Sequence, residues 1–126
     1  MLLMLSTCIA VVALDQTAKR LVSSRRRFHV VNVRRGWGSQ FVLRIRLALW
    51  LLGTAVAVVL CAAANSTLVA VGTGAIVGGA AGNLIDGVRR AGVLDFIDVR
   101  VWPVFNLADV ALVAGTILIA YRVLGW

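Results

Sequence analysis

Apolar residues are gathered into four long stretches along the chain, separated by polar segments and one short turn. These stretches cover residues 2–22, 47–64, 67–86 and 105–124. A helix needs about 20 mostly apolar residues to cross the hydrocarbon core of a bilayer. Because each stretch comes close to that length, we expect an all-α membrane protein with four transmembrane helices. We expect these helices to form a single domain over residues 1–126.

Residues 23–46, between the first two stretches, are the longest polar part of the chain and hold seven arginines. From Phe28 to Arg35 the side chains alternate with a period of two, until Gly36-Trp37-Gly38 breaks the run. That period is typical of a strand, and tryptophan is enriched where a membrane meets water. We therefore predict a small extracytoplasmic β-like segment over residues 23–46.

The two remaining connections are shorter. Asn65-Ser66 predicts a tight turn between the second and third helices, and residues 87–104 predict an interfacial loop before the fourth. Within the third stretch, glycines recur at a spacing of four, as in Gly74 and Gly78. Small residues at this spacing let helix backbones approach closely in a membrane, so we expect the third helix to be tightly packed.

Composition supports the membrane assignment and limits the partners. The chain is 61% apolar, with a mean hydropathy of +0.96 and a single proline, which is too apolar for a soluble domain of this size. A net charge of +8 would suggest nucleic-acid binding in a soluble protein. Basic residues beside membrane spans instead contact anionic lipid head groups. We expect membrane lipid, and no nucleic acid, as a partner.

Candidate metal ligands are few. Cys8 and Cys61 both lie inside apolar stretches, and His29 is the single histidine. Disulfide frameworks and structural metal sites need several such residues at suitable spacings. We therefore expect no disulfide framework, no metal and no cofactor.

The acidic residues are few and concentrated. The chain has five aspartates and no glutamate, and four of the five lie between residues 78 and 110. Two of them close the phrases Asn83-x-x-Asp86 and Asn106-x-x-Asp109, whose spacing places amide and carboxylate on one helix face. In the first stretch, Asp15 and Lys19 are four residues apart, which favours an ion pair within the helix.

These acids leave three interpretations open. Two carboxyl groups held close together share a proton, so that one can activate water while the other donates to a carbonyl oxygen, as in aspartic proteases. Asp95 and Asp109 could form such a pair, or they could be structural or interfacial acids. Acids within a membrane can also carry ions or protons, and Asp15, Asp86 and Asp109 are the candidates for that role.

Four short motifs, in this order, resemble the successive signatures of the lipoprotein signal peptidases (signal peptidase II). They are Asp15-Gln16-x-x-Lys19, Gly78-Gly79-Ala80-x-Gly82-Asn83-x-x-Asp86, Gly92-x-x-Asp95-Phe96 and Phe105-Asn106-x-Ala108-Asp109. The resemblance covers nearly the whole chain, although residues 23–46 match poorly. It implies that Asp95 and Asp109 are the catalytic pair of an aspartic endopeptidase. It also implies that the residues matching the other motif positions support the site and position the substrate, namely Asp15, Lys19, Asn83, Asp86 and Asn106.

The chain departs from the pattern of that family at two places. The family usually has arginine directly after the position of Asp86, where this chain has Gly87, and Arg89 or Arg90 is a possible substitute. In the polar segment, Arg34 stands where the family has an asparagine that contacts substrate. We therefore expect Arg34 and Arg89 to take part in substrate binding.

The distribution of basic residues and the resemblance to signal peptidase II predict opposite orientations in the membrane. Residues 15–46 and 87–104 carry twelve of the thirteen Lys and Arg residues, so the positive-inside rule places the acid-rich helix ends in the cytoplasm. The resemblance implies that these ends lie outside, since lipoprotein precursors are cleaved after export. We favour the outside orientation.

Together, the motifs lead us to expect a multi-pass, monomeric endopeptidase of the bacterial cell (inner, or plasma) membrane. Its implied substrate is a lipidated prolipoprotein, cut just before the diacylglyceryl-cysteine. The alternative is a catalytically inactive relative that acts as a lipoprotein-binding or lipid-binding membrane module. Gly87 and Arg34 favour that alternative, whereas the presence of both Asp95 and Asp109 argues against it.

Overall fold

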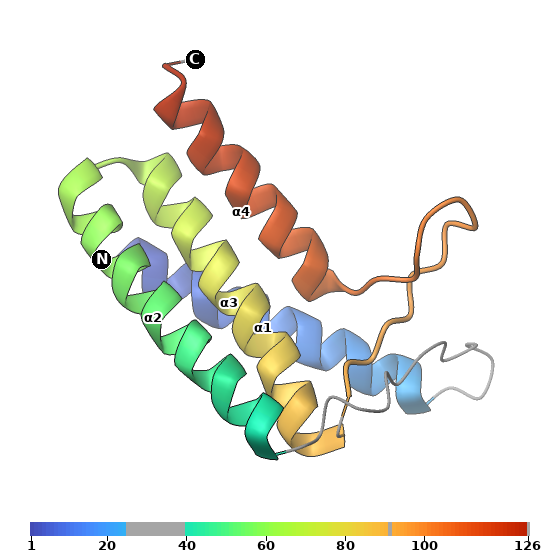
Figure 1. Ribbon diagram of the computed structural model, residues 1–126. Helices are drawn as coiled ribbons and strands as arrows, with labels where there is room; N and C mark the ends of the chain where they lie inside the picture. Colours follow the sequence, from blue (N-terminus) through green and yellow to red (C-terminus); the bar gives the residue numbers. More distant parts are fainter. Residues whose placement is uncertain (25–39, 91, 126) are drawn as a thin grey trace.

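The computed structural model of the chain describes residues 1–24, 40–90 and 92–125 (Figure 1). Within these residues it contains four helices and no strand longer than an isolated bridge: α1 (Leu2–Ser24), α2 (Gln40–Ala64), α3 (Thr67–Arg90) and α4 (Leu107–Val123). The prediction of an all-helical protein is therefore confirmed. Helices α1, α2 and α3 are long and apolar enough to cross a membrane, whereas α4 has 17 residues.

The ends of the helices correct two predicted boundaries. Helix α1 continues to Ser24 and α2 begins at Gln40, so both margins of the predicted β-like segment 23–46 are helical, and the rest of that prediction lies on residues outside the described part of the chain. Helix α3 likewise continues to Arg90, so the predicted loop 87–104 begins too early. Arginine is a good helix former and its long side chain can reach out of the membrane, so arginines can extend the start of α2 and the end of α3 beyond their apolar stretches.

The loop between α3 and α4 is closed by an isolated antiparallel bridge between Ile97 and Phe105. The Ile97 N–H donates to the Phe105 carbonyl oxygen at 2.9 Å, and the Phe105 N–H donates back to Ile97 at 3.1 Å. Because the strands of such a bridge run in opposite directions, the residues before Ile97 lie beside those after Phe105. The bridge thus brings Asp95 next to the residues that begin α4.

Helix α3 is the centre of the bundle, since α1, α2 and α4 all pack against it. Its glycines permit these contacts, as the small-residue spacing predicted. A Cβ atom added at Gly74 would lie 2.5 Å from the Met4 carbonyl oxygen of α1, and one added at Gly72 would lie 2.8 Å from the Gly115 carbonyl oxygen of α4. Backbones this close leave no room for a side chain at either crossing.

Successive helices run in opposite directions along the bundle (Figure 1). The end of α1, the start of α2, the end of α3 and the start of α4 are consequently neighbours, while the Asn65-Ser66 turn joins α2 to α3 at the other end. Asp15, Asp86 and Asp109 therefore share one end of the molecule although they are distant in sequence.

Candidate active site

The first turn of α4 is fixed by its own side chains. Asn106 is the N-cap: its Oδ1 accepts a hydrogen bond from the Asp109 backbone N–H at 3.0 Å, and Asp109 Oδ2 accepts one from the Asn106 backbone N–H at 3.1 Å. This reciprocal arrangement is a capping box, which satisfies backbone donors that a helix start leaves unpaired. One carboxylate oxygen of Asp109 is thereby held against the backbone, and its orientation is set.

A carboxylate from α1 completes this helix start. Asp15 Oδ1 accepts a hydrogen bond from the Ala108 backbone N–H at 3.0 Å, and the Asp15 side chain is fully buried. A negative charge at a helix N-terminus is favourable because the unpaired N–H groups carry partial positive charge there. Asp15 therefore connects the first and last helices of the described chain.

Lys19 is the cation at the centre of the buried network. Its Nζ lies 2.7 Å from Asp15 Oδ2 and 2.8 Å from Asp86 Oδ2, and all three side chains are buried. The neighbouring Gln16 donates from Nε2 to Asp15, to Asp86 and to the Gly82 carbonyl oxygen, each at 3.2 Å. Paired and hydrogen-bonded charges are the form in which ions are tolerated in a protein interior.

Asp86 also holds the chain where α3 gives way to the loop. Its Oδ1 lies 3.1 Å from Arg90 Nη1, and its Oδ2 accepts a hydrogen bond from the Leu94 backbone N–H at 3.2 Å. Arg90 therefore pairs with Asp86, whereas Arg89 is exposed. The role predicted for Arg89 in substrate binding is independent of this ion pair and stays a prediction.

Asp95 and Asp109 are connected through two asparagine amides. Asn106 Nδ2 donates to Asp95 Oδ1 at 2.8 Å and to Asn83 Oδ1 at 3.1 Å, and Asn83 Nδ2 donates to Asp109 Oδ1 at 3.0 Å. Lys19 Nζ also donates to Asn83 Oδ1, at 3.3 Å. Asp95, Asn83 and Asp109 are partly buried, and Asn106 is fully buried. Two carboxylates thus face the same pair of amides near the surface of the bundle.

Most of the residues that the sequence singled out meet in this network: Asp15, Lys19, Asn83, Asp86, Asp95, Asn106 and Asp109 are linked by hydrogen bonds or ion pairs. Arg34 lies outside the described residues. Sequence reasoning overlooked Gln16 as a contributor, although a carboxamide inside an apolar stretch was a signal that it needed buried partners. In residues 1–24, 40–90 and 92–125, no group of three His, Cys, Asp or Glu side chains is placed to hold a metal ion.

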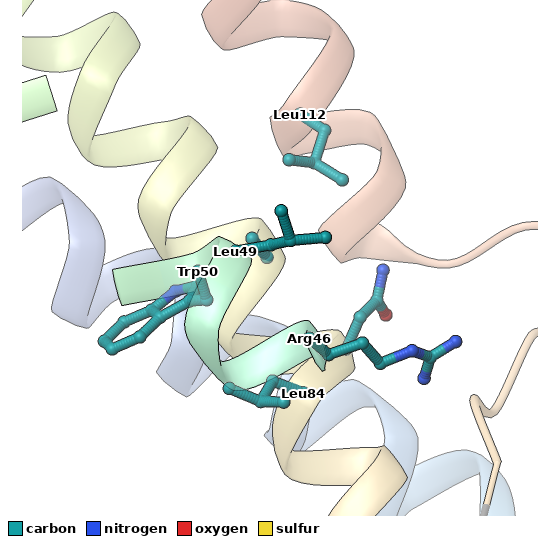
Figure 2. A pocket seen from close by; sticks show the side chains of 7 residues that line it. Arg46, Leu49, Trp50, Leu84 and Leu112 are labelled. Atoms are coloured by element: carbon teal, nitrogen blue, oxygen red, sulfur yellow. The ribbon is translucent and has the colours of Figure 1, made fainter. Parts of the chain in front are cut away.

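Two cavities adjoin the network. One, of about 310 Å³, lies between α2 and α4 over α3 and is lined by Arg46, Leu49, Trp50, Ala80, Asn83, Leu84 and Leu112 (Figure 2). The other, of about 480 Å³, follows α4 from Asp109 to Ile117 and is bordered by Trp102 and Phe105. Each cavity has one member of the polar network in its lining and is otherwise largely apolar. An amphiphilic ligand in the second cavity could therefore reach Asp109.

Comparison with known proteins gives a consistent result. The family described as signal peptidase (SPase) II matches residues 7–125. The lipoprotein signal peptidase of Halothermothrix orenii is 35% identical over 127 aligned residues, which cover 88% of this chain and 88% of that protein. The lipoprotein signal peptidase of Pelotomaculum thermopropionicum is 55% identical over 53 residues, which cover 42% of this chain and 35% of that protein.

Solved structures share the arrangement of the helices. A bacterial membrane enzyme determined by the in meso method at 1.9 Å resolution is similar with a TM-score of 0.78 and 25% identity, over 97% of this chain and 92% of that chain. A second, determined at 2.3 Å, has a TM-score of 0.76 and 24% identity, over 96% of this chain and 87% of that chain. These similarities show that the fold is one found in membrane enzymes.

Proposed function

Because the chain belongs to the signal peptidase II family, we propose that it is an aspartic endopeptidase that removes signal peptides from lipidated prolipoproteins. In this proposal Asp95 and Asp109 are the catalytic pair, and cleavage occurs before the diacylglyceryl-cysteine. The observation that carries the proposal is the bridge of amides by which Asn106 and Asn83 join these two carboxylates.

The geometry supports different roles for the two carboxyl groups, one as general base and the other as general acid. One, ionised, removes a proton from a water molecule as that water attacks the scissile carbonyl carbon. The other, protonated, donates to the carbonyl oxygen as negative charge develops there. The amides of Asn106 and Asn83 hold both carboxyl groups in place without supplying a charge, so the pair can exchange its proton during the reaction.

The membrane gives this chemistry its setting. We place the protein as a multi-pass protein of the bacterial cell membrane, with α4 as its fourth span. A helix of 17 residues is about 25 Å long, and α4 packs along α3, which is itself long and apolar enough to span. We propose that the protein acts as a monomer. Exposed apolar side chains on α2, such as Phe41 and Leu52, would meet lipid.

The proposal is tested by incubating the purified protein with a lipidated prolipoprotein and following the mobility shift of the product. We expect cleavage by the natural sequence and none by Asp109→Asn, because an amide cannot serve as the base. The same shift from the Asp109→Asn variant would contradict the role of the pair. Binding of the precursor with no cleavage by either protein would favour the inactive binding module.

Orientation is tested separately, because an exported precursor reaches only the outer face. In a variant with Cys8 and Cys61 changed to Ala, a cysteine at Val101, in the exposed loop at the acid-rich end, should react in intact cells with an impermeant thiol reagent. A cysteine at Ser66, at the opposite end, should react only after lysis. The reverse pattern would place the network in the cytoplasm, as the positive-inside count predicts.

A further inference from the structure

Arg46 occupies an unusual place for an arginine near a membrane interface. It lies in the second turn of α2 and lines the cavity of about 310 Å³ together with Asn83, a member of the carboxylate network. Figure 2 shows its side chain extending away from the α2 ribbon, to the right in this view. An arginine directed at lipid would reach only toward the head groups. Arg46 instead belongs to the same cavity as a residue that hydrogen-bonds Asp109.

The guanidinium of Arg46 also lies beside Gly87 of α3. A Cβ atom at Gly87 would be 3.6 Å from Arg46 Nη1, and it would meet nothing closer. The side chain of an arginine at position 87 would therefore start close to the guanidinium of Arg46. The chain thus has a cation beside the position that follows Asp86, although α2 supplies it.

The remainder of the cavity suits an apolar peptide. Its other lining residues are apolar or aromatic, and α2 and α4 both pack on α3 while scarcely touching each other. Trp50 fixes one wall, because its indole Nε1 donates to the Val77 carbonyl oxygen of α3 at 3.1 Å. A groove open between two helices can admit the apolar stretch of a signal peptide, typically 7 to 15 residues.

We propose that Arg46 binds the signal peptide: its guanidinium donates hydrogen bonds to backbone carbonyl oxygens of the peptide, whose apolar segment lies in the groove between α2 and α4. This inference rests on the proposed function. A peptide that leaves a helix near its cleavage site has up to four carbonyl groups without partners, and within a membrane no water satisfies them. A guanidinium carries five N–H donors, so one arginine can satisfy several of these carbonyls.

The carbonyl groups bound by Arg46 are not the one that is attacked, so the contact stabilises the bound substrate and the transition state alike. Loss of such a contact raises KM and leaves kcat almost unchanged. We expect Arg46→Gln to raise KM for a lipidated prolipoprotein about ten-fold, with kcat within about two-fold of the natural value. Arg46→Lys, which keeps the charge but not the planar fork of donors, should give an intermediate KM.

Arg44 offers the matched control, since it lies two positions before Arg46 in the same turn and is exposed on another face of α2. Arg44→Gln should leave KM and kcat unchanged. In the double variant Arg46→Gln with Gly87→Arg, the cation is returned to the same space from α3, and KM should fall back toward the natural value. An equal KM for Arg46→Gln and Arg44→Gln would overturn the inference, as would a loss confined to kcat.

A binding measurement separates failure of this inference from failure of the proposed function. Proteins that carry Asp109→Asn are titrated in detergent micelles with a fluorescent peptide that contains the signal peptide followed by the diacylglyceryl-cysteine, with thermal unfolding recorded for each variant. Adding Arg46→Gln should raise the Kd for the peptide about ten-fold, whereas adding Arg44→Gln should leave this Kd unchanged. If the natural protein fails to cleave and this difference persists, the peptidase proposal is wrong and the role of Arg46 stands. Equal Kd values for the two double variants would show that Arg46 only contacts lipid.

Discussion

Two groups of carboxylates lie at the same end of the bundle and differ in what surrounds them. Asp15 and Asp86 are fully buried, and both contact the ammonium of Lys19. Asp95 and Asp109 are partly buried and accept hydrogen bonds from the amides of Asn106 and Asn83. The ammonium pairs with both buried carboxylates, whereas an amide orients a carboxyl group without adding a charge. The first group is suited to holding helices together and the second to moving protons.

The largest effect should come from the second group. Asp95→Asn removes one carboxyl group of the pair and keeps its size, so cleavage of a lipidated prolipoprotein should fall by about four orders of magnitude. Thermal unfolding in detergent should change little, since the Asn106 amide still finds an oxygen at position 95. Turnover close to the natural rate would place Asp95 outside the chemistry.

The first group should respond in stability. Lys19→Met leaves Asp15 and Asp86 buried without the ammonium that both contact, and breaking a buried pair in this way costs about 3–5 kcal/mol. We expect a clear drop in the midpoint of unfolding, measured in detergent by denaturant titration. Replacement of all three side chains by apolar residues should be better tolerated than Lys19→Met alone. The opposite ranking would mean that the cluster does more than hold the helices.

A smaller effect on stability should follow from loosening the close crossing of α3 and α4. A Cβ atom at Gly115 would lie 2.5 Å from the Gly72 carbonyl oxygen, so Gly115→Ala should push α4 away from α3 and cost about 1–3 kcal/mol. Gly53→Ala in α2 is the matched control, because nothing lies within 4 Å of its Cβ position. That change should be neutral or stabilising by up to about 1 kcal/mol. Equal destabilisation by both would rule out the close crossing.

The smallest effect is expected at Asp98, which belongs to neither group. Its side chain is exposed and accepts a hydrogen bond from the Arg100 backbone N–H at 2.7 Å. Asp98→Ala should therefore leave the rate of cleavage within about two-fold of the natural value. A loss as deep as that of Asp95→Asn would show that Asp98, and not Asp95, is the partner of Asp109.

The four helices were well predicted, because each long apolar stretch indicates a helix. Their ends were harder to predict. Arg44 and Arg46 made residues 40–46 read as polar loop, yet long basic side chains extend a helix at an interface instead of ending it. The same reasoning explains why α3 continues past Gly87 to Arg90.

The sequence identified most residues of the polar network, but it did not reveal which of them contact one another. Spacing indicated that Asp15 and Lys19 share a face, and the structure confirms their ion pair. Spacing could not reveal that Asp86 shares the same lysine, because that contact depends on how α1 and α3 cross. Arg46 escaped notice for a similar reason: its neighbours Asn83 and Gly87 are on another helix and some forty residues away in sequence.

The spacing of Asp15 and Lys19 has a consequence for how the protein is made. These two side chains lie four residues apart on α1, and their contact depends on no other helix. A newly synthesised α1 can therefore enter the bilayer with the charges of Asp15 and Lys19 already matched, which lowers the cost of moving each into hydrocarbon. The partners on α3 and α4 become available only as later parts of the chain leave the ribosome. Until those helices are present, Asp15 serves as the counterion of Lys19 within α1 itself.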